Sequence, residues 1–244
     1  MSIAVSPLAR KLGAFVALSE VELAALEVFH QHRRTFDAGV DLVREGQPIK
    51  SAYVLEDGWV CSYKLLSNGT RQIVDFQVPG DFLGLRSFLF RTSDHNVEAM
   101  TRVEVAEVSL NDLTDAFANT PRLATAVLWA VARDEAVVVE HLVDIGRRNS
   151  LERTAHFLLE LGARLKLVGL GSKEGFACPL PQHMLADALG LSPVHMNRVL
   201  RKLREKGLLT FRNGHVMFDD FEQLVALADF DTAYLDQDGT LLRQ

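Results

Sequence analysis

Cysteine is scarce in this chain, whose 244 residues include only Cys61 and Cys178, far apart in the sequence. Two such thiols cannot build a disulfide framework or supply the four ligands of an iron–sulfur cluster. The chain also lacks an apolar run near the ~20 residues that a transmembrane helix needs. Its N-terminal segment contains several acids instead of the basic-then-apolar pattern of a signal peptide. We therefore expect a cytoplasmic protein with two incidental thiols and no membrane partner.

Catalytic and metal-binding motifs are missing as well. The pairs His30/His32 and His183/His195 do not have the His-Glu-x-x-His spacing of zinc hydrolases, and the sequence contains no serine nucleophile elbow. The glycine-rich stretch Gly169–Gly175 lacks the Lys-Ser/Thr end and the following helix of a phosphate-binding loop. We expect no enzyme activity, no metal site and no cofactor.

The charge of the chain is unevenly distributed along the sequence. Hydrophobic residues at 48% and charged residues at 24% are ordinary globular values, and the length favours two domains over one. The formal net charge is −6, yet the segment Asn149–Phe218 contains ten Lys/Arg and five Asp/Glu, which is a net +5. Basic charge is thus concentrated in one part of the chain, where phosphates could be bound.

The segment Pro181–Gly207 predicts two helices joined by a tight turn at Gly190–Leu191. Ser192 is a suitable N-cap for the second helix, and Pro193 stands at its first position, where a missing N–H costs nothing. Apolar side chains at helical spacing predict the buried face, and they are Leu185, Ala186, Leu189, Met196, Val199, Leu200 and Leu203. The opposite face of the second helix carries Asn197, Arg198, Arg201, Lys202 and Arg204.

A predicted hairpin follows this helix pair. Leu208–Arg212 and His215–Phe218 flank Asn213–Gly214, which is a strong signal for a two-residue turn. A helix pair followed by such a hairpin is typical of a winged helix-turn-helix, whose second helix enters the DNA major groove. The alternative is a short helical hairpin with a solvated outer face, and the basic charge of the segment favours double-stranded DNA.

The first half of the chain predicts a helical start and then short strands. We expect residues 1–35 to be helical, with a capping box at Ser19 and Glu22 and an end at Arg33–Arg34. Its buried side would consist of Val21, Leu23, Leu26 and Phe29. Strands are predicted at Leu42–Val43, Ser51–Leu55, Trp59–Leu66, Thr70–Val78 and Val97–Val108. Because glycine turns separate them, with a hairpin at Asn68–Gly69, we expect a β-roll, barrel or sandwich.

A long helix is predicted after Pro121, over residues 122–148. Its heptad seam consists of Ala124, Leu128, Val131, Glu135, Val138, Leu142 and Ile145. Such a seam favours a parallel helix dimer, held chiefly by Leu128, Val131, Val138, Leu142 and Ile145. The alternative is a helix packed only on its own β-domain. Ser150 is the predicted cap of the next helix, which runs to about Val168.

The order of a β-roll, a long helix and a winged helix-turn-helix resembles the Crp/Fnr superfamily of bacterial transcription regulators. The matching segments are Leu42–Gln47, Tyr53–Gly58, Pro79–Gly84, Val103–Val108 and the helix-turn-helix. The resemblance implies an α+β chain with a cyclic-nucleotide-binding-like β-roll and N-terminal helix at 1–120, a dimerisation helix at 121–148, a winged helix-turn-helix at 149–230 and an acidic tail at 231–244. It also implies a homodimer on a two-fold symmetric operator, with RNA polymerase as a partner.

Two departures from the family concern the effector. Where members that bind cyclic nucleotide have a glutamate for the ribose, this chain has Leu85. Where they have an arginine and a Ser/Thr for the phosphate, Ser93 and Asp94 stand, and Asp94 would repel an anion. A loop two residues longer would let Arg91 supply the cation. We expect no cyclic-nucleotide binding, and Gly84, Leu85, Arg91 and Ser93 remain a candidate pocket for an unidentified effector.

The resemblance also assigns roles on the DNA side. Arg198 falls on the family's guanine-reading arginine, and Val194 stands where the family has a base-reading glutamate. Val194 can touch a thymine methyl group, and Asn197 and His195 complete the predicted base-reading set. The predicted phosphate contacts are Gln182, His183, Ser192, Arg201, Lys202 and Arg212. The alternative function is a β-roll signalling or docking module whose winged helix mainly contacts protein partners.

Overall fold

The computed structural model describes residues 3, 6–48, 51–85, 90 and 92–235. The described residues form two compact units. The first is drawn from residues 1–65 and 75–134, and the second from residues 66–74 and 135–235. The chain therefore passes from one unit to the other at the two ends of a short hairpin segment and once within a long helix.

The predicted β-roll consists of two antiparallel four-stranded sheets, and all of it except residues 66–74 belongs to the first unit. One sheet has the order β1 (His32–Phe36), β8 (Val103–Ser109), β3 (Ser51–Asp57), β6 (Phe82–Leu83). The other has the order β2 (Asp41–Val43), β7 (Asn96–Ala99), β4 (Val60–Leu65), β5 (Arg71–Gln77). Both sheets contribute buried side chains to one core, which includes Val43, Leu55, Val60, Val97 and Val105. The predicted turn at Asn68–Gly69 joins β4 to β5, and Leu66 donates its N–H to the Thr70 carbonyl at 2.8 Å.

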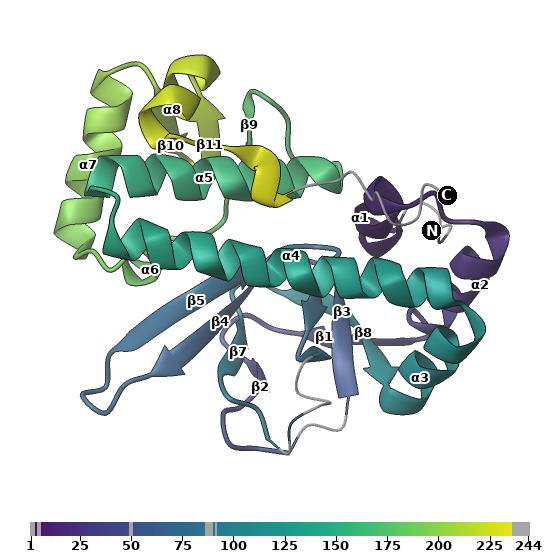
Figure 1. The fold of residues 1–244 in the computed structure, drawn as a ribbon. Helices are drawn as coiled ribbons and strands as arrows, with labels where there is room; N and C mark the ends of the chain where they lie inside the picture. The colour runs from purple at the N-terminus through teal and green to yellow at the C-terminus, as the bar shows by residue number, and fades with distance from the viewer. Residues whose placement is uncertain (1–2, 4–5, 49–50, 86–89, 91, 236–244) are drawn as a thin grey trace. The chain divides into compact units, whose positions relative to one another are not determined.

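Helices cover the sheet that contains β8. They are α1 (Pro7–Phe15), α2 (Glu20–Val28), α3 (Leu110–Asn119) and the first half of α4 (Pro121–Gly146). Figure 1 shows α4 as one uninterrupted helix. Leu12, Leu26, Leu113 and Leu123 pack with strand residues such as Ala106 in a second core. The helices thus shield the apolar face of the sheet from water.

A buried lysine of α1 forms ion pairs with an aspartate of the roll and with an aspartate of α4. Lys11 of α1 is 2% exposed, and its Nζ lies 2.7 Å from Asp81 and 3.2 Å from Asp134 of α4. Burial lowers the pKa of Lys11, but Asp134 and Asp81 raise it by more, so the net pKa is above its ordinary value. A buried charge of this kind is tolerated because both acids compensate it.

Three predictions for the N-terminal half are wrong. The helical segment ends at Val28, and Arg33 and Arg34 lie in β1, where they pair with Glu104 and Glu107 of β8. Val21 is 64% exposed instead of buried. The capping box at Ser19 and Glu22 is confirmed. Cross-strand pairing with acids some seventy residues later outweighs the local helical pattern.

The third error concerns the run Val97–Val108, which is two strands in different sheets. The chain turns at Met100–Arg102, and the Asp57–Gly58 turn packs against this corner. A Cβ atom on Gly58 would lie 2.5 Å from the Arg102 carbonyl oxygen, and the φ of Gly58 is +88°. Glycine at this position therefore permits the close approach of the two turns.

The second unit holds the winged helix-turn-helix. Its elements are α5 (Ser150–Leu167), β9 (Gly175–Ala177), α6 (Gln182–Ala188), α7 (Pro193–Glu205), β10 (Leu209–Arg212), β11 (His215–Phe218), α8 (Phe221–Ala228) and the 3-10 helix η3 (Thr232–Leu235). Asn213 and Gly214 both have positive φ, 51° and 71°, as the predicted two-residue hairpin requires. The wing also has a third strand, because β9 pairs with β11.

The N-cap of α5 differs from the prediction by one residue. Asn149, and not Ser150, accepts hydrogen bonds from the N–H groups of Leu151 and Glu152, and Glu152 returns a bond to the Asn149 N–H. Asparagine caps as well as serine does, and only Asn149 has a glutamate three residues later to complete a capping box. The helix begins at the same place in either case.

Buried ion pairs join the second half of α4 to α5. The Glu160 carboxylate lies 3.0 Å from the His141 ring and 3.4 Å from Arg164, and it is inaccessible to solvent. Burial raises the pKa of Glu160, but His141 and Arg164 lower it by more, so its net pKa is below the ordinary value. Arg148 bonds to Asp144 at 2.9 Å at the end of α4. The contact between His141 and Glu160, together with that between His156 and Asp144 at 3.3 Å, holds α5 against the second half of α4.

Candidate nucleic-acid interface

The helix-turn-helix has the local geometry that its residues predict. At the turn, Gly190 has a φ of +61°, and the Leu191 N–H donates to the Ala186 carbonyl at 2.9 Å. The Ser192 hydroxyl caps α7 by accepting the His195 N–H at 3.2 Å. All seven apolar positions predicted for the inner faces of the two helices are buried. The inner face of α7 is therefore fixed by packing, which determines the face that points outward.

The outer face of α7 is exposed and basic. Its exposed side chains are Asn197, Arg198, Arg201, Lys202 and Arg204. Arg201 makes a loose ion pair with Glu205 at 3.6 Å on the surface, which is worth little in water. The guanidinium groups are therefore available to an anion, and each offers a planar fork that matches a phosphate or the edge of guanine.

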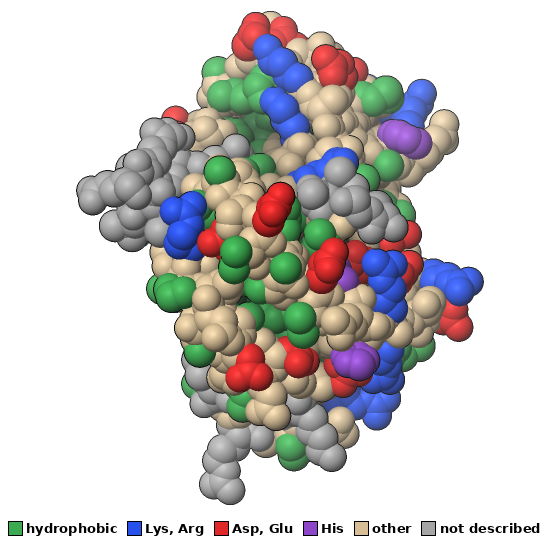
Figure 2. Space-filling view, turned by 90° about the vertical axis from the view of Figure 1, so that its right-hand side faces the viewer, with side chains coloured by type: hydrophobic (Ala, Val, Ile, Leu, Met, Phe, Trp, Pro, Cys, Tyr) green, Lys and Arg blue, Asp and Glu red, His purple; other side chains and the backbone are tan. Residues whose placement is uncertain are grey.

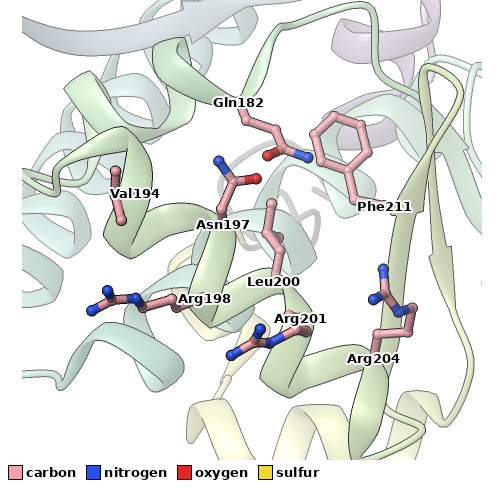
Figure 3. Close-up of a pocket in the computed structure, with 8 residues that line it drawn as sticks. All are labelled: Gln182, Val194, Asn197, Arg198, Leu200, Arg201, Arg204 and Phe211. Atoms are coloured by element: carbon pink, nitrogen blue, oxygen red, sulfur yellow. The ribbon is translucent and has the colours of Figure 1, made fainter.

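A groove of about 430 Å³ runs beside this face (Figure 3). The described residues that line it come from α6, α7 and the wing, and they are Gln182, Val194, Asn197, Arg198, Leu200, Arg201, Arg204 and Phe211. Three of these eight are arginines, and none is an acid. Figure 3 shows Gln182 and Phe211 facing α7 from the start of α6 and from β10. The groove therefore combines positive charge with an apolar side.

Five of the predicted DNA-contact residues line this groove, and five do not. Val194, Asn197, Arg198, Gln182 and Arg201 are brought together. The remaining five are exposed elsewhere on the same unit, and they are His183, Ser192, His195, Lys202 and Arg212.

Besides Ser192 and Arg201, two more of the predicted contacts have polar partners within the unit. The His195 ring lies 3.1 Å from the Ser150 hydroxyl at the start of α5, so it ties α7 to its neighbour. The Asn197 amide nitrogen donates to the Pro193 carbonyl at 3.0 Å, which leaves its oxygen and its second N–H for a ligand. The structure thus favours Asn197 over His195 as a group that can face outward.

Three lining residues were not selected from the sequence. Arg204 could have been found, because it follows Arg201 at a spacing of three residues on the same helical face. Leu200 contributes to the core as well, and Phe211 lies on the same face of β10 as the buried Leu209, so both match an ordinary core pattern. Nothing in the local sequence distinguishes a half-buried wing aromatic that lines a groove from one that fills a core.

The predicted seam of α4 is solvent-exposed within one chain. Leu128 is 67% exposed and Leu142 is 73% exposed, and Val131, Val138 and Ile145 are exposed as well. The other face of α4 buries Leu123, Ala126, Val127, Ala130 and Val137. The helix therefore packs on its own chain with one face and leaves a heptad-spaced apolar stripe exposed on the other.

The candidate effector residues are only partly described. Arg91 lies outside the described residues. Gly84 has a φ of +70°, and Leu85 packs against the core beneath the helices. The Ser93 hydroxyl donates to the His95 carbonyl at 2.7 Å, and the Asp94 carboxylate lies 2.7 Å from the His95 ring. Ser93 thus uses its donor within its own loop.

Among the described residues, no helix is long and apolar enough to cross a membrane. On the face drawn in Figure 2, acidic and basic side chains are interspersed and hydrophobic ones are scattered among them. Burial raises the pKa of the Cys178 thiol to about 11, which keeps it protonated and unreactive at neutral pH.

Comparison with known proteins identifies both domains. Residues 33–120 match the cyclic nucleotide-binding domain model, and residues 152–227 match the Crp-like helix-turn-helix domain model. The nitrogen fixation regulation protein FixK of Bradyrhizobium diazoefficiens is 31% identical over 213 residues, covering 86% of this chain and 88% of FixK. The anaerobic regulatory protein of Pasteurella multocida is 24% identical over 211 residues, covering 86% of this chain and 77% of its own.

Solved structures agree with these matches. The structure of FixK2 from Bradyrhizobium japonicum superposes with a TM-score of 0.71 at 28% identity, covering 80% of this chain and 96% of FixK2. The family members matched here are named as regulators and not as enzymes. The order of domains, the winged helix-turn-helix and these relatives together show that the chain belongs to the Crp/Fnr family of transcription regulators.

Proposed function

We propose that this protein is a homodimeric regulator that binds a two-fold symmetric DNA operator in a sequence-specific way. The main support for the proposal is the groove beside α7. Its lining contains three arginines, three apolar side chains and no acid. A major groove of DNA has phosphates along its rims and base edges at its floor. Arginines can bind the phosphates and guanine edges, and apolar side chains can contact thymine methyl groups. RNA polymerase is the proposed protein partner, because the family consists of transcription regulators.

Base reading is assigned to the first turns of α7. Arg198 donates to the O6 and N7 atoms of guanine, Val194 contacts a thymine methyl group, and Asn197 pairs with adenine. His195, which is bonded to Ser150, positions the helix start and contacts bases only secondarily. Phosphates are held by Arg201, Lys202 and Arg212, with Gln182, His183 and Ser192 as polar neighbours.

Dimerisation is assigned to the exposed seam of α4. Leu128, Val131, Val138, Leu142 and Ile145 would meet the same residues of a second copy, as an isologous interface requires. A dimer places two α7 helices on one duplex, with half-sites about one helical turn apart. The β-roll is proposed to respond to an effector other than a cyclic nucleotide, because Leu85 and Asp94 replace the groups that would hold one.

A salt titration of binding to random duplex DNA tests this function. Three cationic phosphate contacts in each protomer, about six in the dimer, predict a slope of log affinity against log salt of about −5. A winged helix that contacts only protein partners would show no measurable affinity for the duplex at any salt concentration. That result would favour the docking-module alternative.

A further inference from the structure

A segment of the β-roll hairpin is part of the second unit. Residues 66–74, from the end of β4 through the first half of β5, are grouped with the helix-turn-helix. Two of their side chains contact α6, the first helix of that motif. The Arg71 Nε donates to the Asp187 carboxylate at 3.1 Å, and another nitrogen of Arg71 lies against the Met184 sulfur. The Gln72 amide nitrogen donates to the Asp187 and Ala188 carbonyls at 3.2 and 3.1 Å.

These contacts matter because α6 has only seven residues. The last four carbonyls of a helix lack partners within it, and a helix this short is not stable by itself. The Leu185 and Ala186 carbonyls accept the N–H groups of Leu189 and Leu191. The next two carbonyls, those of Asp187 and Ala188, accept the side-chain amide of Gln72.

The last carbonyl at this end, that of Leu189, accepts the Arg153 guanidinium at 2.9 Å. Every carbonyl from Leu185 to Leu189 therefore has a donor. Two of these five hydrogen bonds come from the side chain of one glutamine, which lies more than a hundred residues away in the sequence. An amide that bonds to carbonyls at a helix C-terminus acts as a C-cap.

We propose that the β4–β5 hairpin is a latch that caps α6 and makes the helix-turn-helix depend on the state of the β-roll. Beyond Val74 the strand β5 continues directly into the first unit, so a rearrangement of β5 in the roll would withdraw Gln72 and Arg71 from α6. The freed helix would then support α7 less firmly. The consequence for DNA rests on the proposed function, whereas the capping contact does not.

The test combines Arg71→Ala with Gln72→Ala in the full-length protein. Gln77→Ala is the matched control, because Gln77 lies on the same strand and its amide nitrogen bonds to the Ser62 hydroxyl at 2.9 Å instead of α6. Without DNA, amide hydrogen exchange within α6 should become about three- to tenfold faster in the double variant and stay unchanged in the control. With DNA, affinity for operator and random duplex should fall together by a similar factor, while the preference for the operator persists.

Several outcomes would decide the matter. Unchanged exchange in α6 would overturn the latch, and so would an equal acceleration in the Gln77→Ala control, because the effect would then belong to hairpin folding. If the double variant does not fold, Gln72→Glu replaces it, since a carboxylate cannot donate to carbonyls, and Gln77→Glu becomes its control. Faster exchange in α6 combined with a wild-type protein that binds no duplex would support the latch and contradict the proposed function.

Discussion

Helices α4 and α7 are built on the same principle and differ in their outer faces. Each buries an apolar face at helical spacing and exposes the opposite one. The exposed face of α7 is basic, with Arg198 and Arg201 beside an acid-free groove. The exposed face of α4 is apolar, with Leu128 and Leu142 mostly accessible to water.

The difference between the two faces indicates different partners. Arginine side chains are well solvated in an isolated chain, and they gain most when they release the counterions of a polyanion. A single exposed leucine is unremarkable, but a continuous stripe at heptad spacing leaves apolar area in water that a matching helix would cover. One surface therefore suits nucleic acid, and the other suits a second copy of the chain.

The largest expected effect comes from making the apolar face of α4 charged, so that it is no longer suited to a second copy of the chain. The double substitution Val138→Asp and Leu142→Asp should convert dimers to monomers in sedimentation. Burying one valine or leucine side chain contributes about 1.5–3 kcal/mol to the free energy of association. In a two-fold symmetric dimer each residue is buried in both chains, so the contribution doubles. Val21→Asp is the control, since Val21 is an exposed valine on α2. A dimer that persists in the double variant would refute the seam.

The next effect concerns the buried face of α4. Lys11→Met leaves the Asp81 carboxylate buried without its cation, and we expect a loss of about 3–5 kcal/mol in the free energy of unfolding. Because the folded pKa of Lys11 is raised above 10.5, its contribution is present below that pH and is lost as the pH rises through the folded pKa. Denaturant titrations at neutral and alkaline pH measure both quantities.

The control for this prediction is Lys64→Met, which removes a solvent-exposed ion pair with Glu45 and should cost at most about 1 kcal/mol. Specificity for DNA should survive in both variants, because neither residue belongs to the second unit, which holds α7. Equal losses from Lys11→Met and Lys64→Met would mean that the buried pair contributes nothing special to the packing of α4.

The third effect separates two arginines of the α7 face. Arg198→Ala should cost about 1–3 kcal/mol on the operator and relax the preference at one guanine. Arg201→Ala should weaken operator and random duplex alike, because a phosphate carries no sequence information. Fluorescence anisotropy on both duplexes measures the difference. If Arg198→Ala weakens both duplexes equally, base reading must rest on Val194 and Asn197.

A smaller effect tests the apolar side of the groove. Replacing the contacted thymine by uracil removes one methyl group and should reduce affinity by about 0.8 kcal/mol in the wild type. The same replacement should have no effect on Val194→Ala. The comparison takes four affinities in a double-mutant cycle. An additive cycle would show that Val194 does not contact that methyl group.

The smallest effect concerns the rim of the interface. Lys202→Ala or Arg212→Ala should make the salt dependence shallower by about one unit for each phosphate contact removed. The order of preference among DNA sequences should not change. Affinities measured at several salt concentrations give the slope. An altered sequence preference in either variant would show that the replaced residue contacts bases and not only phosphates.

Local chemistry explains why α7 and the wing could be predicted from the sequence. Ser192 and Pro193 start the helix, Gly207 ends it with a φ of +68°, and Asn213–Gly214 sets the hairpin. Each of these signals acts within a few residues. The heptad spacing of α4 is equally local, so its exposed stripe could be located without knowledge of the tertiary fold.

Long-range pairing explains what the sequence did not reveal. Arg33 and Arg34 lie in a strand because their partner acids come from β8. The short β9 is extended because it pairs with β11, and a Cβ atom on Gly175 would lie 2.0 Å from the Val216 carbonyl oxygen. The cap that Gln72 places on α6 depends on a contact between distant segments in the same way. Such partners follow from the tertiary fold and not from local periodicity.

Selection of bound duplexes from a random pool tests the assigned partners of the α4 and α7 faces together, because a symmetric site requires both a dimer and base reading. We expect enrichment of an inverted repeat with half-sites about one helical turn apart, bound by two chains per duplex. Each half-site should contain a guanine whose selection disappears in Arg198→Ala. Enrichment of a single unrepeated site bound by one chain, or no enrichment at all, would contradict this expectation.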